Sequence, residues 1–217
     1  MNPEVKTGPV FCPDCTLCPR LATFLVRTKH ENPDYFCKPV PPFGDPQPSL
    51  LIVGLAPGMH GANRTGRPFT GDYAGILLYE SLHGAGLSTA SVSTDRFDGL
   101  QLKGARISNA VKCLPPDNKP MPAEIKTCNR YLAAELQQLV SVRSILALGT
   151  VAHDAVLMAL GLKKSAAKFG HGNEHELPGG RRMIDSYHCS RYNTNTRRLT
   201  TEMFQQVLGR AKLLAGL

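Results

Sequence analysis

Short, continuous apolar runs alternate along the chain with longer stretches in which apolar residues recur at helical spacing. The apolar runs predict four strands, at residues 50–54, 106–111, 144–148 and 183–187. The periodic stretches predict five helices, at residues 15–27, 73–85, 123–139, 151–160 and 200–214. Continuous apolar runs are typical of strands buried on both faces, as in parallel sheets. The pattern therefore predicts an α/β fold, a three-layer α/β/α sandwich with a central, mainly parallel four-stranded sheet.

The segments between these elements are rich in proline, glycine and polar residues. Closely spaced prolines argue against regular structure in residues 33–48 and predict a connector. Residues 1–14 are expected to be loosely held, and residues 163–180 to form a basic excursion that contains glycines. A length of 217 residues suits one hydrophobic core. We therefore expect a single domain over residues 1–217, with residues 1–48 as its N-terminal segment.

Three loops with unusual composition follow predicted strands. They come after Val53, after Val111 and after Tyr187. Ligands of open parallel sheets bind beyond the carboxyl ends of the strands. These loops are therefore expected to meet at one edge of the sheet and to form one site.

The chain carries a formal net charge of +8, with a pI near 9.2. A basic balance suits a polyanionic partner, because neutralised phosphates release counterions and so contribute affinity. No apolar run approaches the roughly 18 residues that a membrane span requires. The first residues show no signal peptide, so we expect a cytoplasmic protein without a membrane role. Nothing indicates an oligomer, and a monomer is expected.

Seven cysteines in a chain expected to be cytoplasmic favour metal binding, catalysis or buried thiols over disulfides. Three of them have the spacing C-x-x-C-x-x-C, and two more flank the second loop and the helix after it. Four thiolates from these two regions can hold a zinc ion or an iron–sulfur cluster, and the isolated second pair suits a cluster better. The alternative is a set of idle or buried thiols. These cysteines are Cys12, Cys15, Cys18, Cys113 and Cys128; Cys37 and Cys189 are expected to be idle.

The first loop, residues 54–72, is dense in glycine, arginine and aromatic side chains. Its glycines permit close backbone approach, and its main-chain donors can face an anion or a base edge. Arg64 and Arg67 can meet phosphates, and Phe69 can stack on a flat ring. Asp72 precedes a predicted helix, so it can serve as the helix N-cap, as a chemical group, or as both. The loop lacks the ending of a nucleotide-binding P-loop.

The other two loops supply further polar groups. His188 follows a strand and can donate a hydrogen bond to a developing negative charge, although a lone histidine is more often structural. Arg191 beside it can enter or line a groove. Asn118 lies between prolines, where it is either a turn residue or an amide that reads a pyrimidine edge.

Together these loops resemble family 5 of the uracil-DNA glycosylase superfamily. The resemblance rests on GLAPGMHGANRTGRPFTGD, NAVKCLPPDNKP and SYHCSRYNTNTRRLT, with CTLCPRL near the N-terminus, and covers nearly the whole chain. It implies an α/β/α sandwich and a structural [4Fe–4S] cluster that ties down the segment 1–48. The implied cluster ligands are Cys15, Cys18, Cys113 and Cys128; Cys12 lies outside this set.

The resemblance also implies a reaction. The enzyme would flip uracil out of double-stranded DNA, cleave its N-glycosidic bond and so initiate base excision repair. Phe69 would stack on the base and His188 would hydrogen-bond it as it departs. Residues Gly54, Ala56 and Gly58 would complete the base pocket, and the DNA contacts would come from Arg64, Arg67, Ser190 and Arg191.

One position departs from the wider superfamily. Related branches place a water-activating Asp or Asn where this chain has Ala56. Family 5 shares the apolar residue at this position. Asp72 is therefore expected to position the water or stabilise the cation, with Asn118 as a second candidate. A less discriminating pocket would also accept bases such as hypoxanthine and ethenocytosine. Two other functions remain open, a non-catalytic nucleic-acid-binding module held together by a metal and a zinc-dependent hydrolase.

Overall fold

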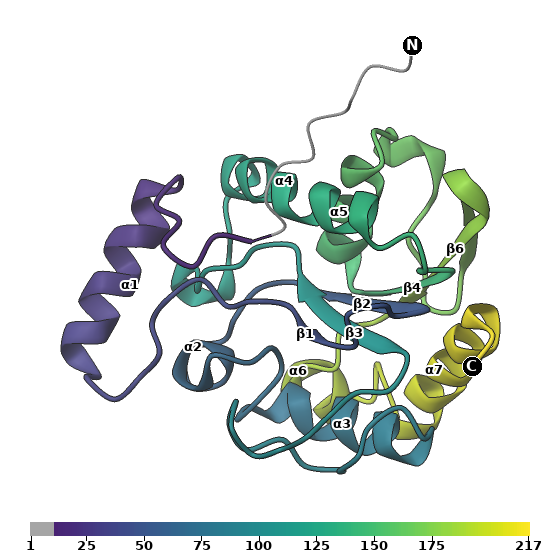
Figure 1. Ribbon diagram of the computed structural model, residues 1–217, viewed down its shortest axis with the longest axis horizontal. Coiled ribbons are helices and arrows are strands. Elements are labelled where there is room, and N and C mark those ends of the chain that lie inside the picture. Colours follow the sequence, from purple (N-terminus) through teal and green to yellow (C-terminus); the bar gives the residue numbers. More distant parts are fainter. Residues whose placement is uncertain (1–10) are drawn as a thin grey trace.

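The protein, described by a computed structural model over residues 11–217, is built on one six-stranded sheet (Figure 1). The strand order is β1-β3-β2-β4-β6-β5. The four central strands are parallel, as predicted. They are β3 (Ala105–Asn109), β2 (Leu50–Gly54), β4 (Ser144–Leu148) and β6 (Arg181–Ser186). Of the segment expected to be loosely held, residues 1–10 lie outside the described residues.

The prediction of four strands was incomplete, because two antiparallel strands close the sheet edges. Strand β1 (Phe43–Gly44) pairs with β3 and lies in the proline-rich segment expected to be a connector. Strand β5 (Glu174–Leu177) pairs with β6 inside the expected excursion 163–180. An edge strand pairs on one side only and needs no continuous apolar run. In β5 only Leu177 is buried, so the apolar pattern carried no signal.

Helices cover both faces of the sheet, which gives the three predicted layers (Figure 1). Helices α3 (Tyr73–Gly84) and α7 (Thr201–Ala215) pack on one face. Helices α4 (Pro122–Gln138) and α5 (Thr150–Ala159) pack on the other. All residues of β2 and β4 are buried between these layers, as their continuous apolar sequences require.

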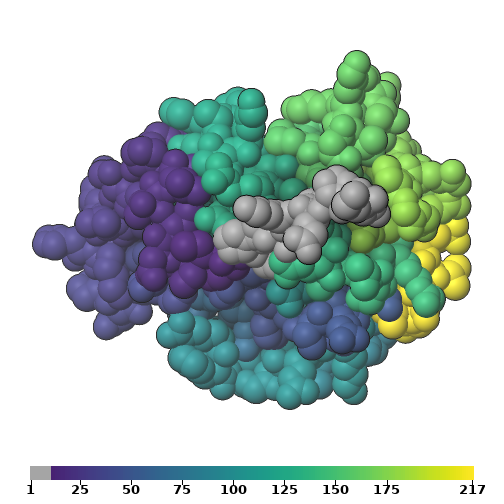
Figure 2. All heavy atoms as spheres, turned by 45° about the horizontal axis from the view of Figure 1, so that its top comes forward, coloured from purple at the N-terminus to yellow at the C-terminus, as the bar shows by residue number. Residues whose placement is uncertain are grey.

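Helix α1 (Pro19–Glu31) lies outside the two layers and packs beside α4 (Figure 2). Arg20 makes two hydrogen bonds to the Glu124 carboxylate, at 2.7 and 2.8 Å. The helix begins at Pro19, where a missing N–H costs nothing, and not near residue 15 as predicted. Cys15 and Cys18 therefore precede the helix.

Several loops contain short helices that the apolar pattern did not predict. These are α2 (Ala62–Thr65), α6 (Arg191–Asn195) and the 3₁₀ turns η1 (Pro116–Asn118), η2 (Lys164–Ala166) and η3 (Pro178–Gly180). Over the part of the chain that the structure describes, every helix is too short or too polar to cross a membrane.

The strand register brings the three distinctive loops to one edge. Gly54 at the end of β2 is paired with Asn109 at the end of β3, and Leu148 of β4 is paired with Ser186 of β6. Since all four strands run in the same direction, the loops that follow β2, β3 and β6 leave the sheet together.

Candidate active site

A pocket opens at this edge, and all three loops contribute to its wall. The residues that line it include Ala56, Gly58, Phe69, Asp72, Asn118, His188, Ser190 and Arg191, all expected from the sequence, together with Asn109. Gly54 is the expected base-pocket residue that does not line it. A methyl group on Gly54 would lie 2.6 Å from the Phe69 ring and 2.5 Å from Oδ1 of Asn109, so this glycine makes room for both side chains.

Phe69 is held in an uncommon backbone conformation with its ring at the pocket wall. Its φ is +53°, a value that side chains other than glycine rarely adopt. The carbonyl of Phe69 lies so close to Gly75 that a methyl group there would be 1.8 Å away. The Phe69 ring stacks against His188 with ring centres 5.8 Å apart and planes inclined by 30°. The ring is buried, so the pocket presents a fixed aromatic surface.

Asp72 is both the N-cap of α3 and a pocket residue. One carboxylate oxygen, Oδ1, accepts a hydrogen bond of 3.0 Å from the Gly75 amide. The other, Oδ2, faces the first loop, where a methyl group on Gly61 would lie only 2.2 Å from it. Burial raises the pKa of the Asp72 carboxyl, against the lowering effect of the amides of Gly75 and Ala74. The capping and chemical roles considered for this residue are thus compatible.

His188 lines the pocket at the start of the loop after β6. Its backbone carbonyl accepts a hydrogen bond of 2.8 Å from Asn193, which fixes the loop. Burial lowers the pKa of His188 to about 4. The imidazole is therefore neutral at physiological pH, with one ring N–H available as a donor.

The pocket contains two asparagines with different surroundings. Asn118 is exposed at the end of η1, with φ +56°. Asn109 is 3% exposed, and its Oδ1 accepts no hydrogen bond from the described residues. A buried amide oxygen left unpaired is costly unless a ligand satisfies it. The sequence did not single out Asn109, because the predicted strand ran on to Val111, whereas β3 ends at Asn109, where ligands of parallel sheets bind.

A buried lysine connects Asn109 to the cysteine-rich region. The Lys112 ammonium donates hydrogen bonds to the Asn109 carbonyl at 2.9 Å and to Oγ of Ser108 at 2.5 Å. The Glu135 carboxylate lies 3.7 Å from the same ammonium and balances its charge. The backbone N–H of Lys112 donates to Sγ of Cys128 at 3.3 Å. One residue therefore contacts both the pocket strand and a predicted cluster ligand.

The rim of the pocket presents groups suited to DNA. Ser190 caps α6 through the Asn193 amide, and the Arg191 guanidinium lies 5.1 Å from the centre of the Tyr73 ring. Arg64 is exposed on α2, with its Nε hydrogen-bonded to the His60 carbonyl at 2.8 Å. These three expected DNA contacts are all close to the pocket.

Arg67 does not fit the expected role of a phosphate contact. Its side chain is 4% exposed and forms a 2.7 Å ion pair with Asp98. The guanidinium also donates to Ser93 at 2.8 Å and lies 4.3 Å from the centre of the Phe43 ring. Its position next to a proline and an aromatic residue gave no sign of this burial. The expectation for Arg67 is therefore corrected to a structural ion pair.

The four cysteines expected to bind the cluster line one cavity between α1, the end of β3 and α4. They are Cys15, Cys18, Cys113 and Cys128. Burial raises the pKa of the Cys18 thiol to about 11, and it raises the pKa of Cys113 and Cys128 as well, with neighbouring thiols adding to the effect at Cys18 and Cys113. The raised pKa values favour the protonated thiols. A bound metal would reverse this, because its positive charge stabilises the thiolates.

The sulfur positions bear on the type of metal group. A tetrahedral zinc site holds its thiolates about 3.8 Å apart, given Zn–S bonds of about 2.3 Å. No three of the cysteine sulfurs, all of which belong to described residues, lie within 4.8 Å of one another. A cubane binds each thiolate to a different iron, so it requires wider spacing. Among the described residues, the cysteine sulfurs are not gathered as a closed zinc site, and the four thiols that line the cavity are the ones that could hold a metal group. Cys12 packs beside this group but is not among the residues that line the cavity.

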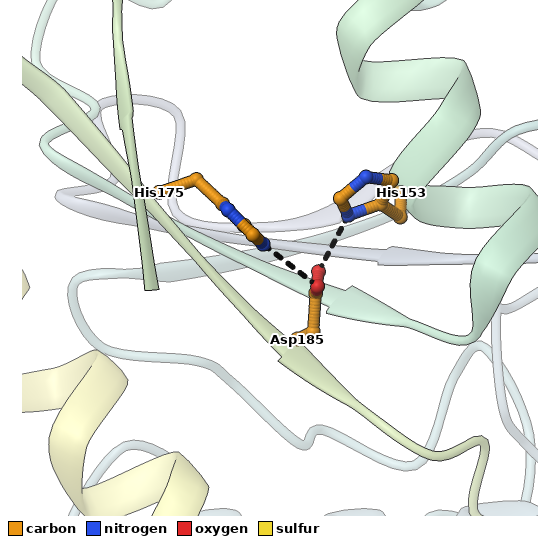
Figure 3. Close-up of side chains that lie close together, drawn as sticks. All are labelled: His153, His175 and Asp185. Carbon is orange, nitrogen blue, oxygen red and sulfur yellow. Dashed lines mark hydrogen bonds and ion pairs between the residues drawn. The ribbon is translucent and has the colours of Figure 1, made fainter. Parts of the chain in front are cut away.

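A second polar cluster is formed by His153, His175 and Asp185, in which both imidazoles point at the Asp185 carboxylate (Figure 3). Asp185 accepts hydrogen bonds from His153 Nδ1 at 2.8 Å and His175 Nε2 at 2.9 Å. The second ring nitrogen of His153 faces the Ala167 carbonyl at 3.2 Å. Both nitrogens of His153 thus face acceptors, an arrangement that favours the imidazolium form beside the Asp185 carboxylate. The cluster is saturated as a hydrogen-bonded ion pair that joins α5, β5 and β6.

Comparison with known proteins agrees with this architecture. Residues 41–212 match the model of the uracil DNA glycosylase superfamily. The chain is 51% identical over 208 residues to a type-5 uracil-DNA glycosylase of Thermus thermophilus, covering 94% of each sequence. It is 44% identical to a type-5 enzyme of Mycobacterium bovis, covering 94% of this chain and 79% of the relative. A type-4 uracil-DNA glycosylase of Thermotoga maritima is 34% identical over 65% of this chain and 64% of its own. The chain therefore belongs to the uracil DNA glycosylase superfamily.

Proposed function

We propose that this protein is a uracil-DNA glycosylase that hydrolyses the N-glycosidic bond of uracil in double-stranded DNA, as a monomer, and so initiates base excision repair. The observation that carries the proposal is one pocket with a fixed aromatic ring, an unpaired buried amide, a buried carboxylate and a neutral imidazole. The names of the relatives support the same activity.

Recognition of the base requires that it leave the duplex. A base inside the stack is out of reach, so the nucleotide must rotate into the pocket, at a cost that is lowest for a mispaired base. Phe69 offers its ring for stacking. Asn109 offers an amide with both a donor and an acceptor, which matches the paired donor and acceptor of a uracil edge. The unpaired Oδ1 of Asn109 supports this role, because an imide N–H of the base would satisfy it.

The chemistry then assigns opposite charges to opposite sides of the pocket. As the bond between the sugar C1′ and the base nitrogen breaks, the base takes the electron pair and becomes anionic, and the sugar becomes cationic. The neutral His188 donates a hydrogen bond to the departing base. The Asp72 carboxylate stabilises the sugar cation and orients the water whose oxygen adds to C1′. The proton that this water loses neutralises the departing base anion. Asn118 is the second candidate for orienting the water. Ala56 leaves no polar group at the position used elsewhere in the superfamily.

The small side chains of the pocket wall near Ala56 and Gly58 bear on which bases the pocket can accept. Small side chains there leave space that a bulkier polar residue would fill. We therefore include hypoxanthine and ethenocytosine among the proposed substrates. Arg64, Ser190 and Arg191 would hold the DNA backbone around the extruded nucleotide.

We also infer that Cys15, Cys18, Cys113 and Cys128 hold a [4Fe–4S] cluster. When bound, the cluster supplies four metal–thiolate bonds that join the segment before α1 to the domain core. In this chain, Lys112 hydrogen-bonds both a cluster ligand and the Asn109 carbonyl, so the cluster region and the base pocket share one support. The chain would then be a single domain, with the N-terminal segment up to residue 48 attached through the cluster.

The proposal is tested by incubating the protein with a duplex that contains one uracil in water enriched in ¹⁸O. We expect free uracil in solution and one ¹⁸O atom on the abasic sugar, both measured by mass spectrometry. An identical duplex with thymine at that position is the matched control. Tight binding of the uracil duplex without release of uracil would favour the non-catalytic binding module instead.

A further inference from the structure

A second groove lies beside the candidate active site, and its lining combines aromatic and cationic side chains. We call it the Phe97 groove and define it by Tyr35, Phe36, Arg64, Arg96 and Phe97. Phe97 is 80% exposed, an unusual state for so large an apolar side chain in a groove. Exposed aromatic rings next to cations are characteristic of surfaces that bind single-stranded nucleic acid.

The lining of the groove carries four cations, Lys29, Lys38, Arg64 and Arg96, against two carboxylates, Asp34 and Asp95, so its charge balance is positive. Lys29 keeps its charge while it donates to two backbone carbonyls, and Lys38 lies 3.2 Å from Asp14. The exposed guanidinium groups of Arg64 and Arg96 are held by backbone and aromatic groups, so their charges stay available to a polyanion. Arg96 lies 4.9 Å from the centre of the Phe36 ring and 4.6 Å from the centre of the Phe97 ring. The guanidinium and the two rings together form a surface that is both aromatic and cationic.

The loop that carries Arg96 and Phe97 is held in place by the side chain of Asp98. Asp98 forms the buried ion pair with Arg67 at 2.7 Å. The Asp98 carboxylate also accepts hydrogen bonds of 2.9 Å from the amides of Thr94 and Leu100. Arg67, which the sequence suggested as a DNA contact, instead fixes the loop that presents Phe97. A fixed aromatic platform loses little conformational entropy when a base stacks on it.

The Phe97 groove and the active-site pocket share a wall. His60 lines the pocket, and its Nδ1 is hydrogen-bonded to the Tyr35 hydroxyl at 2.8 Å. The His60 carbonyl accepts a hydrogen bond from Arg64, which lines the groove. The groove therefore adjoins the pocket through His60 and Arg64, within reach of a strand whose nucleotide enters the pocket.

We propose that the Phe97 groove binds unpaired nucleotides that flank the base in the active site. Phe97 stacks on an unpaired base, and Arg96 and Arg64 contact the phosphates beside it. Paired bases inside a duplex offer no free face to an aromatic ring, so the ligand is a single-stranded or locally opened segment. The inference rests on the proposed glycosylase function, which brings the strand to this edge of the protein.

The test measures binding of a fluorescent 12-nucleotide oligothymidine, which contains no uracil, to the full-length holoprotein by anisotropy. Loss of one base stack is worth about 1–3 kcal/mol, so F97A is expected to weaken binding at least fivefold. R96A is expected to lower the slope of log affinity against log salt by about 0.7, the value for one phosphate contact on a single strand. The matched controls are V140A, which removes an 84% exposed apolar side chain elsewhere, and K163A, which removes an exposed cation elsewhere.

The outcomes separate the groove from the proposed activity. Weaker binding by F97A and R96A, with unchanged binding by both controls, supports the groove. Equal binding by F97A and wild type, or no binding of the oligothymidine by wild type, overturns it, even if uracil is excised normally. Binding that depends on Phe97 in a protein that releases no uracil would support the groove and contradict the proposed activity. Unfolding temperatures of F97A and wild type verify that both are folded.

Discussion

Replacing Asp72 by asparagine separates the two roles that the structure gives this residue. Asn is as good an N-cap as Asp, so D72N keeps the acceptor for the Gly75 amide. D72A removes the acceptor, which costs about 1 kcal/mol of stability. Both variants remove the buried negative charge. The pair therefore distinguishes the cap from the chemistry within one position.

The size of the expected loss of rate follows from the environment of the Asp72 carboxylate. A cation about 4 Å from a partly buried anion is stabilised by about 4 kcal/mol when the effective dielectric constant is about 20. If most of this interaction develops only in the transition state, its loss slows the reaction roughly 100- to 1,000-fold. We expect D72N and D72A to share this loss of rate.

D72N is expected to lose activity without losing stability. Burial raises the pKa of Asp72, so the folded state binds this proton more tightly than the unfolded state. The ionised group therefore costs stability, and this cost grows as pH rises from the unfolded pKa of about 3.9 through the raised folded value. At neutral pH we expect D72N to be at least as stable as wild type, and D72A to be less stable than D72N.

Single-turnover excision of uracil and chemical unfolding at pH 7.5 and pH 4 measure both effects. A wild-type rate in D72N would refute the assignment of Asp72 to the chemistry. A large loss of stability in D72N would refute the account of its burial.

Three further predictions concern other parts of the molecule. Gly61→Ala places a methyl group 2.2 Å from Oδ2 of Asp72, so the carboxylate must move; we expect single-turnover excision to slow at least tenfold, and an unchanged rate would contradict the tight contact. Burial opposes the charge on His153, but the Asp185 carboxylate outweighs it and raises the pKa of His153, so its stabilising effect is complete below about pH 6.5 and is lost as pH rises through the raised value. Unfolding temperature should therefore fall more steeply above pH 6.5 in wild type than in His153→Gln, and parallel curves would refute the ion pair. Cys113→Ser should lower the iron and sulfide content and the unfolding temperature, whereas a full iron complement would show that Cys113 is not a ligand.

The central sheet was predictable because its strands are buried on both faces. The predicted strands 50–54 and 144–148 agree with the structure residue by residue, since continuous apolar runs leave no ambiguity about burial. The edge strands β1 and β5 were not predictable from this pattern, because pairing on one side imposes no apolar run. Their short sequences contain proline-rich or charged neighbours that favoured loops.

The candidate site was predictable as a set of loops but not in its interior contacts. Strand polarity alone indicated that the loops carrying Phe69, Asn118 and His188 would meet. Burial of individual polar side chains was not readable from the sequence. Arg67 looked like a surface cation but pairs with a carboxylate 31 positions along the chain. Asn109 lay inside the predicted strand 106–111, but it ends β3 and lines the pocket with an amide whose oxygen has no partner among the described residues.

The most direct test of the central claim is strand cleavage at a uracil. The iron-loaded protein is incubated with a duplex that carries one uracil opposite guanine, and the DNA is then heated in alkali, which breaks the strand at an abasic site. We predict one break at the uracil position, at a rate reduced at least 100-fold in D72N, and none in a duplex with thymine at that position. An intact uracil strand after incubation with folded, iron-loaded protein would contradict the account.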